Sequence, residues 1–149
     1  MRPKRSILLI DGDSDLRGAL AEQLELHEDF AALQAESAAV GLQLSSERQI
    51  DLILLESDLP DIDGMEACKS LRLAGVRAPI IMLIGAAAAS NAEASLDSGA
   101  SDYVAKPFKF SVLLGRIRAH LRSHEQSEDS LFRIGPYEFR PGAKLLMDE

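Results

Sequence analysis

The sequence predicts an α/β fold in which a parallel β-sheet is covered by helices on both faces. Three apolar runs, at residues 7–10, 52–55 and 80–84, contain no alternating polar residues. Such runs are typical of strands that are buried on both faces of a sheet. Segments with helical periodicity lie between these runs, and this alternation indicates parallel βαβ units.

Strands and helices are expected to alternate five times up to about residue 123. Two weaker strands are expected at 30–35 and 102–105. The first helix has Ser14 as its candidate N-cap. The residues expected on one face of this helix are Leu16, Leu20, Leu24 and His27. Further helices are expected around 40–47, over 65–74 before Gly75, over 86–98 before Gly99, and from about 109 to 123.

Composition narrows the class of protein. The 149 residues are enough for one domain of ordinary size with a remainder. No apolar stretch approaches the roughly 20 residues of a membrane span, and the N-terminal apolar segment is too short for a secretory signal. We therefore expect a cytoplasmic protein without a membrane partner. The net charge of −8 argues against direct nucleic-acid binding by this chain. The single cysteine excludes an internal disulfide and a Cys-based zinc site.

The character of the sequence changes after the last predicted helix. Residues 124–131 are largely polar and are predicted to be a linker. Short strand-like pieces separated by Gly135-Pro136 and Pro141-Gly142 follow over residues 132–149. So few residues of β-structure cannot bury a core of their own. They are either a β extension of the first domain or the start of a second domain, and we favour the second interpretation.

Chemically active side chains gather where the predicted strands end. Ligands of open α/β sheets bind beyond the carboxyl ends of the strands. The first strand ends at Asp11-Gly12-Asp13, the third at Glu56, the fourth at Ile84, and the fifth just before Lys106. We therefore expect Asp11, Glu56 and Lys106 to lie close together in one cleft.

Four sequence blocks carry a family resemblance: ILLIDGD, DLILLESDLPDIDGMEACKSLR, PIIMLIG and GASDYVAKPF. In order and spacing they resemble the receiver domain of bacterial two-component response regulators. The resemblance implies a flavodoxin-like (βα)5 fold over residues 1–123, with strand order 2-1-3-4-5. The tail FRIGPYEFRPGAKLL is similar to the opening β-sheet of the winged-helix effector in the OmpR/PhoB subfamily. Residues 132–149 would then be the first strands of a truncated DNA-binding domain.

The resemblance also implies roles for the residues at the strand ends. In the family, a histidine kinase phosphorylates an aspartate at the end of the third strand, and two acids after the first strand help to hold Mg²⁺. A Ser or Thr after the fourth strand and a Lys after the fifth bind the phosphoryl oxygens, and an aromatic residue on the fifth strand changes rotamer. This sequence keeps Asp11, Lys106 and the aromatic Tyr103, but has Glu56, Gly12 and Ile84 at the other three positions.

Each of the three departures works against phosphoryl transfer. A glutamate carries its carboxylate about 1.5 Å further than an aspartate, and misplacement by an ångström can cost on the order of 100-fold in rate. Gly12 offers no ligand for Mg²⁺, and Ile84 has no hydroxyl. Asp13 could replace the missing acid, or it is an ordinary acid of a first helical turn. We expect no cofactor, with Mg²⁺ binding weak or absent.

The hypothesis that follows is a direct ion pair between Lys106 and Glu56, which satisfies a partly buried ammonium without metal or phosphate. Glu56 would be a permanent structural charge rather than a phosphoacceptor, which makes a histidine kinase partner doubtful. Tyr103 would then be a fixed aromatic at least as readily as a mobile switch.

The face formed by the fourth helix, fifth strand and fifth helix dimerises in the OmpR/PhoB subfamily. Asp102 and Arg116 match one of its cross-subunit charge pairs. Ala92 and Val112 stand where charged residues are common, which makes the face more apolar. We expect a homodimer through this face that does not await phosphorylation.

The favoured function is that of an atypical response regulator without enzyme activity. It would be the receiver half of a transcriptional regulator that reaches DNA through its effector domain and acts by dimerisation. The alternative is a receiver that is still weakly phosphorylated in a conventional phosphorelay. A flavin-binding or hydrolytic α/β domain is disfavoured, because the chain has no Gly-rich phosphate loop and no nucleophile–His arrangement.

Overall fold

The computed structural model describes residues 3–85 and 92–134, with the side chains of Ala92 and of residues 128–134 left aside. The chain divides into two units, Met1–Ile117 and Arg118–Glu149. The first unit contains the whole sheet and is the part that positions the candidate site. The strand-like pieces predicted over residues 135–149 lie outside the described residues.

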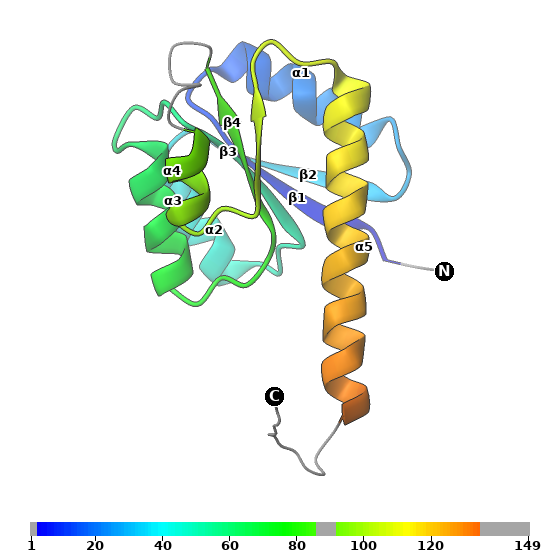
Figure 1. Cartoon of the computed structure of the whole chain (residues 1–149). Helices are drawn as coiled ribbons and strands as arrows, with labels where there is room; N and C mark the ends of the chain where they lie inside the picture. The colour runs from blue at the N-terminus through cyan, green and yellow to red at the C-terminus, as the bar shows by residue number, and fades with distance from the viewer. Residues whose placement is uncertain (1–2, 86–91, 135–149) are drawn as a thin grey trace. The chain divides into compact units, whose positions relative to one another are not determined.

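Strands and helices alternate along the chain as the sequence predicts (Figure 1). The strands are β1 (Arg5–Ile10), β2 (Phe30–Ala35), β3 (Leu52–Glu56), β4 (Ile80–Ile84) and β5 (Asp102–Ala105). The helices are α1 (Ser14–Glu25), α2 (Ala38–Glu47), α3 (Gly64–Leu73), α4 (Ala92–Asp97) and α5 (Phe110–Ile134). Of the helix predicted over 86–98, residues 86–91 lie outside the described residues.

The five strands form one parallel sheet in the order β2-β1-β3-β4-β5, which confirms the predicted α/β topology. In the registers, Glu56 of β3 is level with Leu83 of β4, and Ile84 is level with Ala105 of β5. Because all strands run the same way, their carboxyl ends meet at one edge. Asp11, Glu56 and Lys106 all lie at or just beyond that edge.

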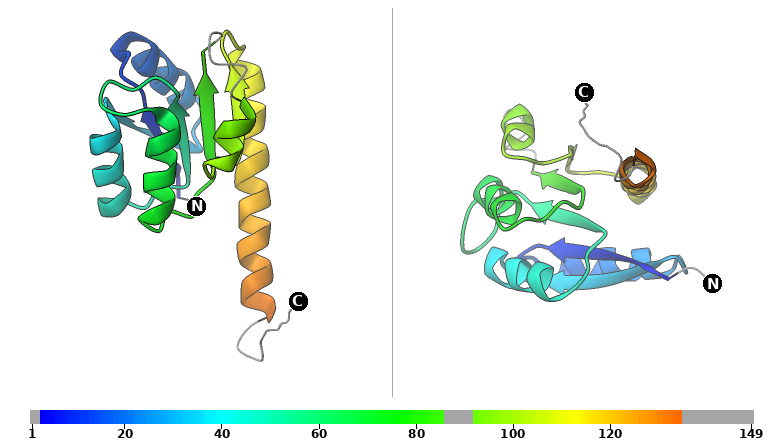
Figure 2. Two further views of the ribbon diagram at one scale, coloured as in Figure 1. Left: turned by 60° about the vertical axis from the view of Figure 1, so that its left-hand side comes forward. Right: turned by 90° about the horizontal axis from the view of Figure 1, so that it is seen from below.

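Apolar side chains fill both faces of the sheet, as expected for strands without polar alternation. One face forms a core with α2 and α3; its fully or nearly fully buried members include Leu8, Ile53, Leu55, Met82 and Leu71. Helix α1 covers the other face, where Leu20 and Leu24 of its predicted stripe are buried (Figure 2). The sheet is therefore enclosed on both sides, and only its edges and strand ends can present polar chemistry.

The first helix begins differently from the prediction. Its N-cap is Asp13, not Ser14: the Asp13 carboxylate accepts hydrogen bonds from the backbone N–H groups of Asp15 and Leu16 at 3.1 and 3.2 Å. Asp13 has extended backbone geometry, while Ser14 is already helical. An aspartate at this position satisfies two of the helix's unpaired N–H groups and interacts favourably with its dipole.

The last helix is longer than predicted, and the linker predicted at residues 124–131 is helical. Helix α5 ends at Ile134 instead of near residue 123. The segment HEQSEDS is rich in residues that tolerate or favour helix, and no Gly or Pro follows Gly115 until Gly135-Pro136. The polar composition of residues 124–131 therefore does not end the helix. Neither α5 nor any other helix in the described part of the chain is long and apolar enough to span a membrane.

Gly64 allows the start of α3 to approach the end of β3. A Cβ at this position would lie 2.5 Å from the backbone oxygen of Glu56 and 2.7 Å from Cα of Ser57. The N–H of Gly64 instead donates to the backbone oxygen of Ser57 at 3.0 Å. The β3–α3 connection is thereby folded closely against the strand end that carries Glu56.

A second contact ties the same connection to α2. The Asp61 carboxylate accepts hydrogen bonds from the backbone N–H groups of Ala38 and Ala39, both at 3.0 Å. The hydroxyl of Ser37, the N-cap residue of α2, accepts a hydrogen bond from the N–H of Val40 at 3.2 Å. The hydrogen bond from Ala38 is the main cause that lowers the pKa of Asp61 below its ordinary value of 3.8.

We predict that Asp61→Asn destabilises the fold at neutral pH, because the two N–H groups bind different carboxylate oxygens and an amide has only one oxygen. Since the pKa of Asp61 is lowered in the folded state, its stabilising contribution is present above pH 3.8 and is lost as the pH falls through the folded value. Urea unfolding at several pH values measures this. Glu22→Gln, which changes an exposed acid of α1, is the control. A stability difference between wild type and Asp61→Asn that does not shrink in acid would contradict the role.

Candidate functional site

The carboxyl edge of the sheet carries an open cleft of about 550 Å³. Its lining combines the ends of β1, β3, β4 and β5 with the β3–α3 connection, and consists of Asp11, Gly12, Asp13, Glu56, Asp58, Leu59, Pro60, Gly85 and Lys106. The three residues expected to meet, Asp11, Glu56 and Lys106, all line this acidic cleft. The topology of a parallel sheet is sufficient to bring them together.

Glu56 is a buried carboxylate at the end of the central strand β3, with its side chain only 5% exposed. Its Oε1 accepts from the backbone N–H and the hydroxyl of Ser57, at 3.1 and 3.4 Å, and lies 3.5 Å from the backbone nitrogen of Asp58. The first turn after the strand therefore wraps around one carboxylate oxygen. The other oxygen, Oε2, remains for a partner on a different strand.

That partner is Lys106, whose ammonium Nζ forms an ion pair and hydrogen bond with Glu56 Oε2. The predicted pair is present. The Lys106 side chain is 27% exposed, so the pair lies at the wall of the cleft rather than on the outer surface. The backbone N–H of Lys106 donates to the oxygen of Ile84 at 2.8 Å, which fixes the root of the side chain beside β4.

Asp11 is the second buried acid of the cleft and is 5% exposed. Its Oδ1 accepts from the N–H of Asp13 at 2.9 Å, whereas its buried Oδ2 has no hydrogen-bond partner. The backbone oxygen of Asp11 accepts from the guanidinium of Arg17 at 2.6 Å, and Arg17 also donates to Gln34 at 2.9 Å. One oxygen of Asp11 therefore remains chemically unsatisfied.

The two residues after Asp11 differ in what they offer to the cleft. Gly12 has no side chain, and a Cβ there would lie 3.0 Å from Cδ of Pro60, so an added side chain needs a small shift of the ring. Asp13 lines the cleft, and Oδ1 of its carboxylate is engaged as the N-cap of α1. It is thus a helix-terminal acid, although it precedes the first turn instead of lying in it.

The donor set does not fit the Mg²⁺ that the family resemblance implies. Mg²⁺ prefers six oxygen ligands in near-ideal octahedral geometry. Of the acids that line the cleft, Glu56 is paired with Lys106, and Oδ1 of Asp13 caps α1. Oδ2 of Asp11 is buried without a partner, and Asp58 is exposed at the rim. Across residues 3–85 and 92–134, no group of three or more His, Cys, Asp or Glu side chains is arranged to hold a metal ion.

Ile84 ends β4 and is 2% exposed, so its side chain belongs to the core and offers no polar contact. It faces the smaller groove that is described below rather than the lining of the acidic cleft. The end of β4, which lies between β3 and β5, is therefore apolar. The ion pair between Glu56 and Lys106 joins the two strands on either side of it.

The residues expected on the dimer face lie on the outer side of the last strand and helices. Tyr103 and Val112 are 36% and 49% exposed, and Leu96 of α4, which the sequence reasoning did not single out, is 42% exposed. Ala92 begins α4, but its side chain lies outside the described residues. These positions give the face an apolar character.

Asp102 and Arg116 pair within one chain, whereas the resemblance implied a cross-subunit pair. The guanidinium Nη1 of Arg116 donates to both carboxylate oxygens of Asp102, at 2.7 and 2.8 Å. This contact is the main cause that raises the pKa of Arg116. The start of β5 and the second turn of α5 are close enough for the two side chains to satisfy each other.

Two contacts of the cleft were not foreseen from the sequence. Ser57 directly follows Glu56, so its closeness in sequence could have suggested that it binds the carboxylate. Arg17 carried no such signal, because its partners are a backbone oxygen after β1 and a side chain of β2. Only the three-dimensional arrangement of α1 over these strands brings them together.

Comparison with known proteins agrees with this architecture. The model of the response regulator receiver domain matches residues 7–118. Response regulator MprA of Mycobacterium sp. (strain KMS) is 35% identical over 126 residues, which cover 83% of this chain and 54% of that protein. Cell cycle response regulator CtrA of Brucella ovis is 35% identical over 143 residues, or 94% of this chain and 60% of that protein. The chain thus spans somewhat more than half the length of these relatives.

Solved structures show the same fold. The crystal structure of a CheY-like response regulator receiver domain protein from Methanospirillum hungatei matches with a TM-score of 0.77 and 28% sequence identity. The match covers 83% of this chain and 98% of that one. The five-stranded sheet, the strand order and the matched residues lead to one conclusion: the chain belongs to the response regulator receiver domain family.

Proposed function

We propose that this chain is an atypical receiver that regulates transcription without aspartyl phosphorylation, through dimerisation. The observation that carries the proposal is the ion pair between Glu56 and Lys106. In the family, the lysine at this position binds phosphoryl oxygens. Here it is already neutralised by a carboxylate that belongs to the chain itself.

The geometry supports a structural role for Glu56. Phosphoryl transfer requires a nucleophilic oxygen that is open to the donor and held in line with it. Oε1 of Glu56 faces the N–H groups and hydroxyl of the next turn, and Oε2 faces Lys106. The carboxylate is therefore engaged on both sides, as a phosphorylated aspartate would be, and acts as its permanent substitute.

Metal binding is proposed to be weak or absent for the same reason. A divalent ion that recruits Glu56 would have to displace Lys106, which costs free energy, and Oδ1 of Asp13 is already held at the N-terminus of α1. Without the metal, the site lacks the charge that orients a phosphoryl donor, and a histidine kinase becomes a doubtful partner. The chain's role is then that of a signalling module without enzyme activity, working in the cytoplasm.

One observation favours the alternative of a weakly phosphorylated receiver. Oδ2 of Asp11 is buried without a hydrogen-bond partner, and a buried unpaired carboxylate oxygen is costly. A bound cation would satisfy it. The alternative therefore predicts a residual affinity for Mg²⁺ that depends on Asp11.

The DNA-binding half of the proposal rests on the tail and on the length of the relatives. FRIGPYEFRPGAKLL is similar to the start of the winged-helix effector in the OmpR/PhoB subfamily. MprA and CtrA, of which the chain covers 54% and 60%, are response regulators of greater length. With its net charge of −8, the chain itself is unsuited to DNA, so DNA contact is assigned to the effector half.

The dimer face is proposed to be α4–β5–α5. Because Asp102 and Arg116 satisfy each other within one chain, they contribute less to a contact between subunits. The exposed side chains of Leu96, Tyr103 and Val112 are left to supply apolar area. Association of this kind needs no phosphoryl group to begin.

The first test compares wild type with Glu56→Asp combined with Gly12→Asp. We expect wild type to show no amide shifts near Lys106 or Tyr103 when Mg²⁺ and beryllofluoride are added and the protein is observed by NMR. The double variant restores the two acids, so it should respond, and its phosphorylation by acetyl phosphate should exceed that of wild type by on the order of 100-fold.

Asp11→Asn is the control in the wild-type background. Shifts in wild type that disappear in Asp11→Asn would establish the alternative function and overturn the proposal. Stable incorporation of phosphate on Glu56 would do the same.

The second test concerns association. Sedimentation of the chain without phosphoryl donor should show a dimer whose dissociation constant is unaffected by beryllofluoride. Val112→Asp should shift it to the monomer, because the change places a charge in the apolar contact. Leu73→Asp, at a position on α3 that is 90% exposed, is the matched control and should leave the dimer intact. A chain that stays monomeric at tens of micromolar would refute the dimer.

A further inference from the structure

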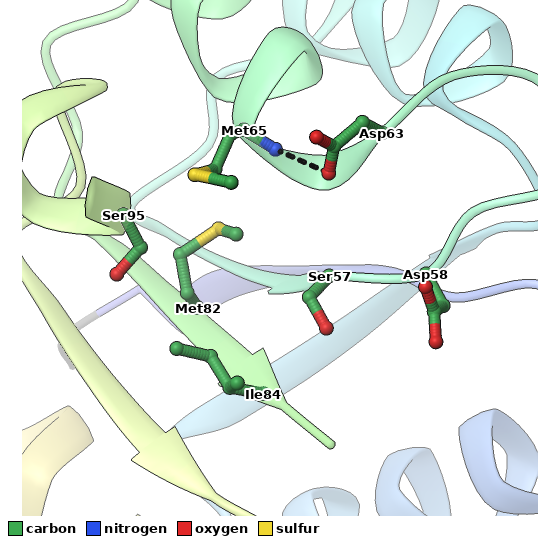
Figure 3. Close-up of a pocket in the computed structure, with 7 residues that line it drawn as sticks. All are labelled: Ser57, Asp58, Asp63, Met65, Met82, Ile84 and Ser95. Carbon is green, nitrogen blue, oxygen red and sulfur yellow. Dashed lines mark hydrogen bonds between the residues drawn. The ribbon is translucent and has the colours of Figure 1, made fainter. Parts of the chain in front are cut away.

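A second hollow lies between the β3 end, β4, α3 and α4 (Figure 3). It adjoins the acidic cleft, with which it shares Asp58. We call it the methionine groove. Its volume is about 260 Å³, and it is lined by Ser57, Asp58, Asp63, Met65, Met82, Ile84 and Ser95. All seven residues belong to the described part of the chain. The function proposed above makes no use of this groove.

The deep part of the groove is apolar and adaptable. The side chains of Met65 and Met82 point toward each other, and Ile84 lies beside Met82 (Figure 3). Met82 and Ile84 are 0% and 2% exposed, so they form a buried floor. Methionine side chains are flexible and polarisable, and they adjust readily to the shape of an apolar ligand.

The rim of the groove is polar and acidic. Asp58 and Asp63 both line the groove and are joined by a backbone bridge. One oxygen of Asp63 is used to accept from the N–H of Met65 at 3.3 Å. Among the residues that the structure describes, none donates a hydrogen bond to the Asp58 carboxylate. Asp58, which also lines the acidic cleft, is therefore the rim charge that is available to a ligand.

The wall between the groove and the acidic cleft is held in place. The N–H and hydroxyl of Ser57 donate to Oε1 of Glu56 at 3.1 and 3.4 Å. Asp63 caps α3, and Gly64 fits closely against the β3 end. A site whose walls are fixed in advance costs little ordering entropy when it binds.

We propose that the methionine groove binds a small primary amine with a compact apolar body. The apolar body contacts Met65, Met82 and Ile84, and the ammonium binds Asp58. An anionic ligand is disfavoured by the two rim carboxylates and by the net charge of −8. The volume lies just below the roughly 300 to 1,000 Å³ of sites for drug-sized ligands, so the ligand contains about one ring.

The proposal goes beyond the proposed function and does not depend on it. Ligand binding requires the groove and Asp58, whereas phosphorylation independence requires the Glu56–Lys106 pair. If the groove does not bind the ligand, the proposal of phosphorylation independence is unaffected, and the reverse also holds. The experiments separate the two proposals because ligand binding is measured without Mg²⁺ or phosphoryl donor.

Benzylamine is the probe, and ¹³C-methyl methionine NMR on the full chain is the readout. The chain has four methionines, of which Met65 and Met82 line the groove; Met65→Leu and Met82→Leu assign their signals. We expect saturable shifts of both methyl signals through the ring current of the ligand. Benzyl alcohol should bind about tenfold more weakly because it lacks the charge-assisted hydrogen bond, and methylammonium should leave the methyl signals unmoved.

Asp58→Asn should weaken benzylamine binding about tenfold and leave benzyl alcohol binding unchanged. Asp58 is exposed, so the substitution preserves the core. Glu22→Gln, an exposed acid on α1, removes the same charge elsewhere and should have no effect. Methyl signals that do not move with benzylamine, or equal affinities of wild type and Asp58→Asn, would overturn the proposal.

Discussion

The burial of one carboxylate constrains the rest of the site. Glu56 ends the central strand with its side chain 5% exposed, and a charge so far out of water is costly unless it is paired. Its partner comes from the far side of β4, because Lys106 follows β5. Two strand spacings separate their backbones by about 10 Å. A glutamate and a lysine together can span this distance, which gives a physical reason for the longer acid at position 56.

Once this pair forms, the other features of the cleft become consistent with one another. Gly12 adds no further carboxylate to the cleft, and Asp13 caps the N-terminus of α1. Ile84 closes the edge of the sheet with a buried apolar side chain. The unsatisfied Oδ2 of Asp11 is the exception, because no described side chain binds it.

The parts of the structure that follow from periodicity were predictable from the sequence. Apolar runs such as Ile80–Ile84 identify strands buried on both faces, and the parallel topology brings Glu56 and Lys106 to one edge. Contacts that join distant segments were not predictable: Asp61 caps a helix 23 residues away, and Arg17 reaches a backbone oxygen. The helical state of residues 124–131 was missed because polarity was interpreted as a linker, although no Gly or Pro lies between Gly115 and Gly135.

A double-mutant cycle on the ion pair tests the central claim most directly. The free energies of unfolding of wild type, Glu56→Gln, Lys106→Met and the double variant are measured in urea at neutral pH. A direct contact predicts that the two single effects fail to add, with a coupling free energy of about 1 to 3 kcal/mol. Additivity within about 0.5 kcal/mol would mean that the two side chains do not interact, and Glu56 would then have to be explained without Lys106.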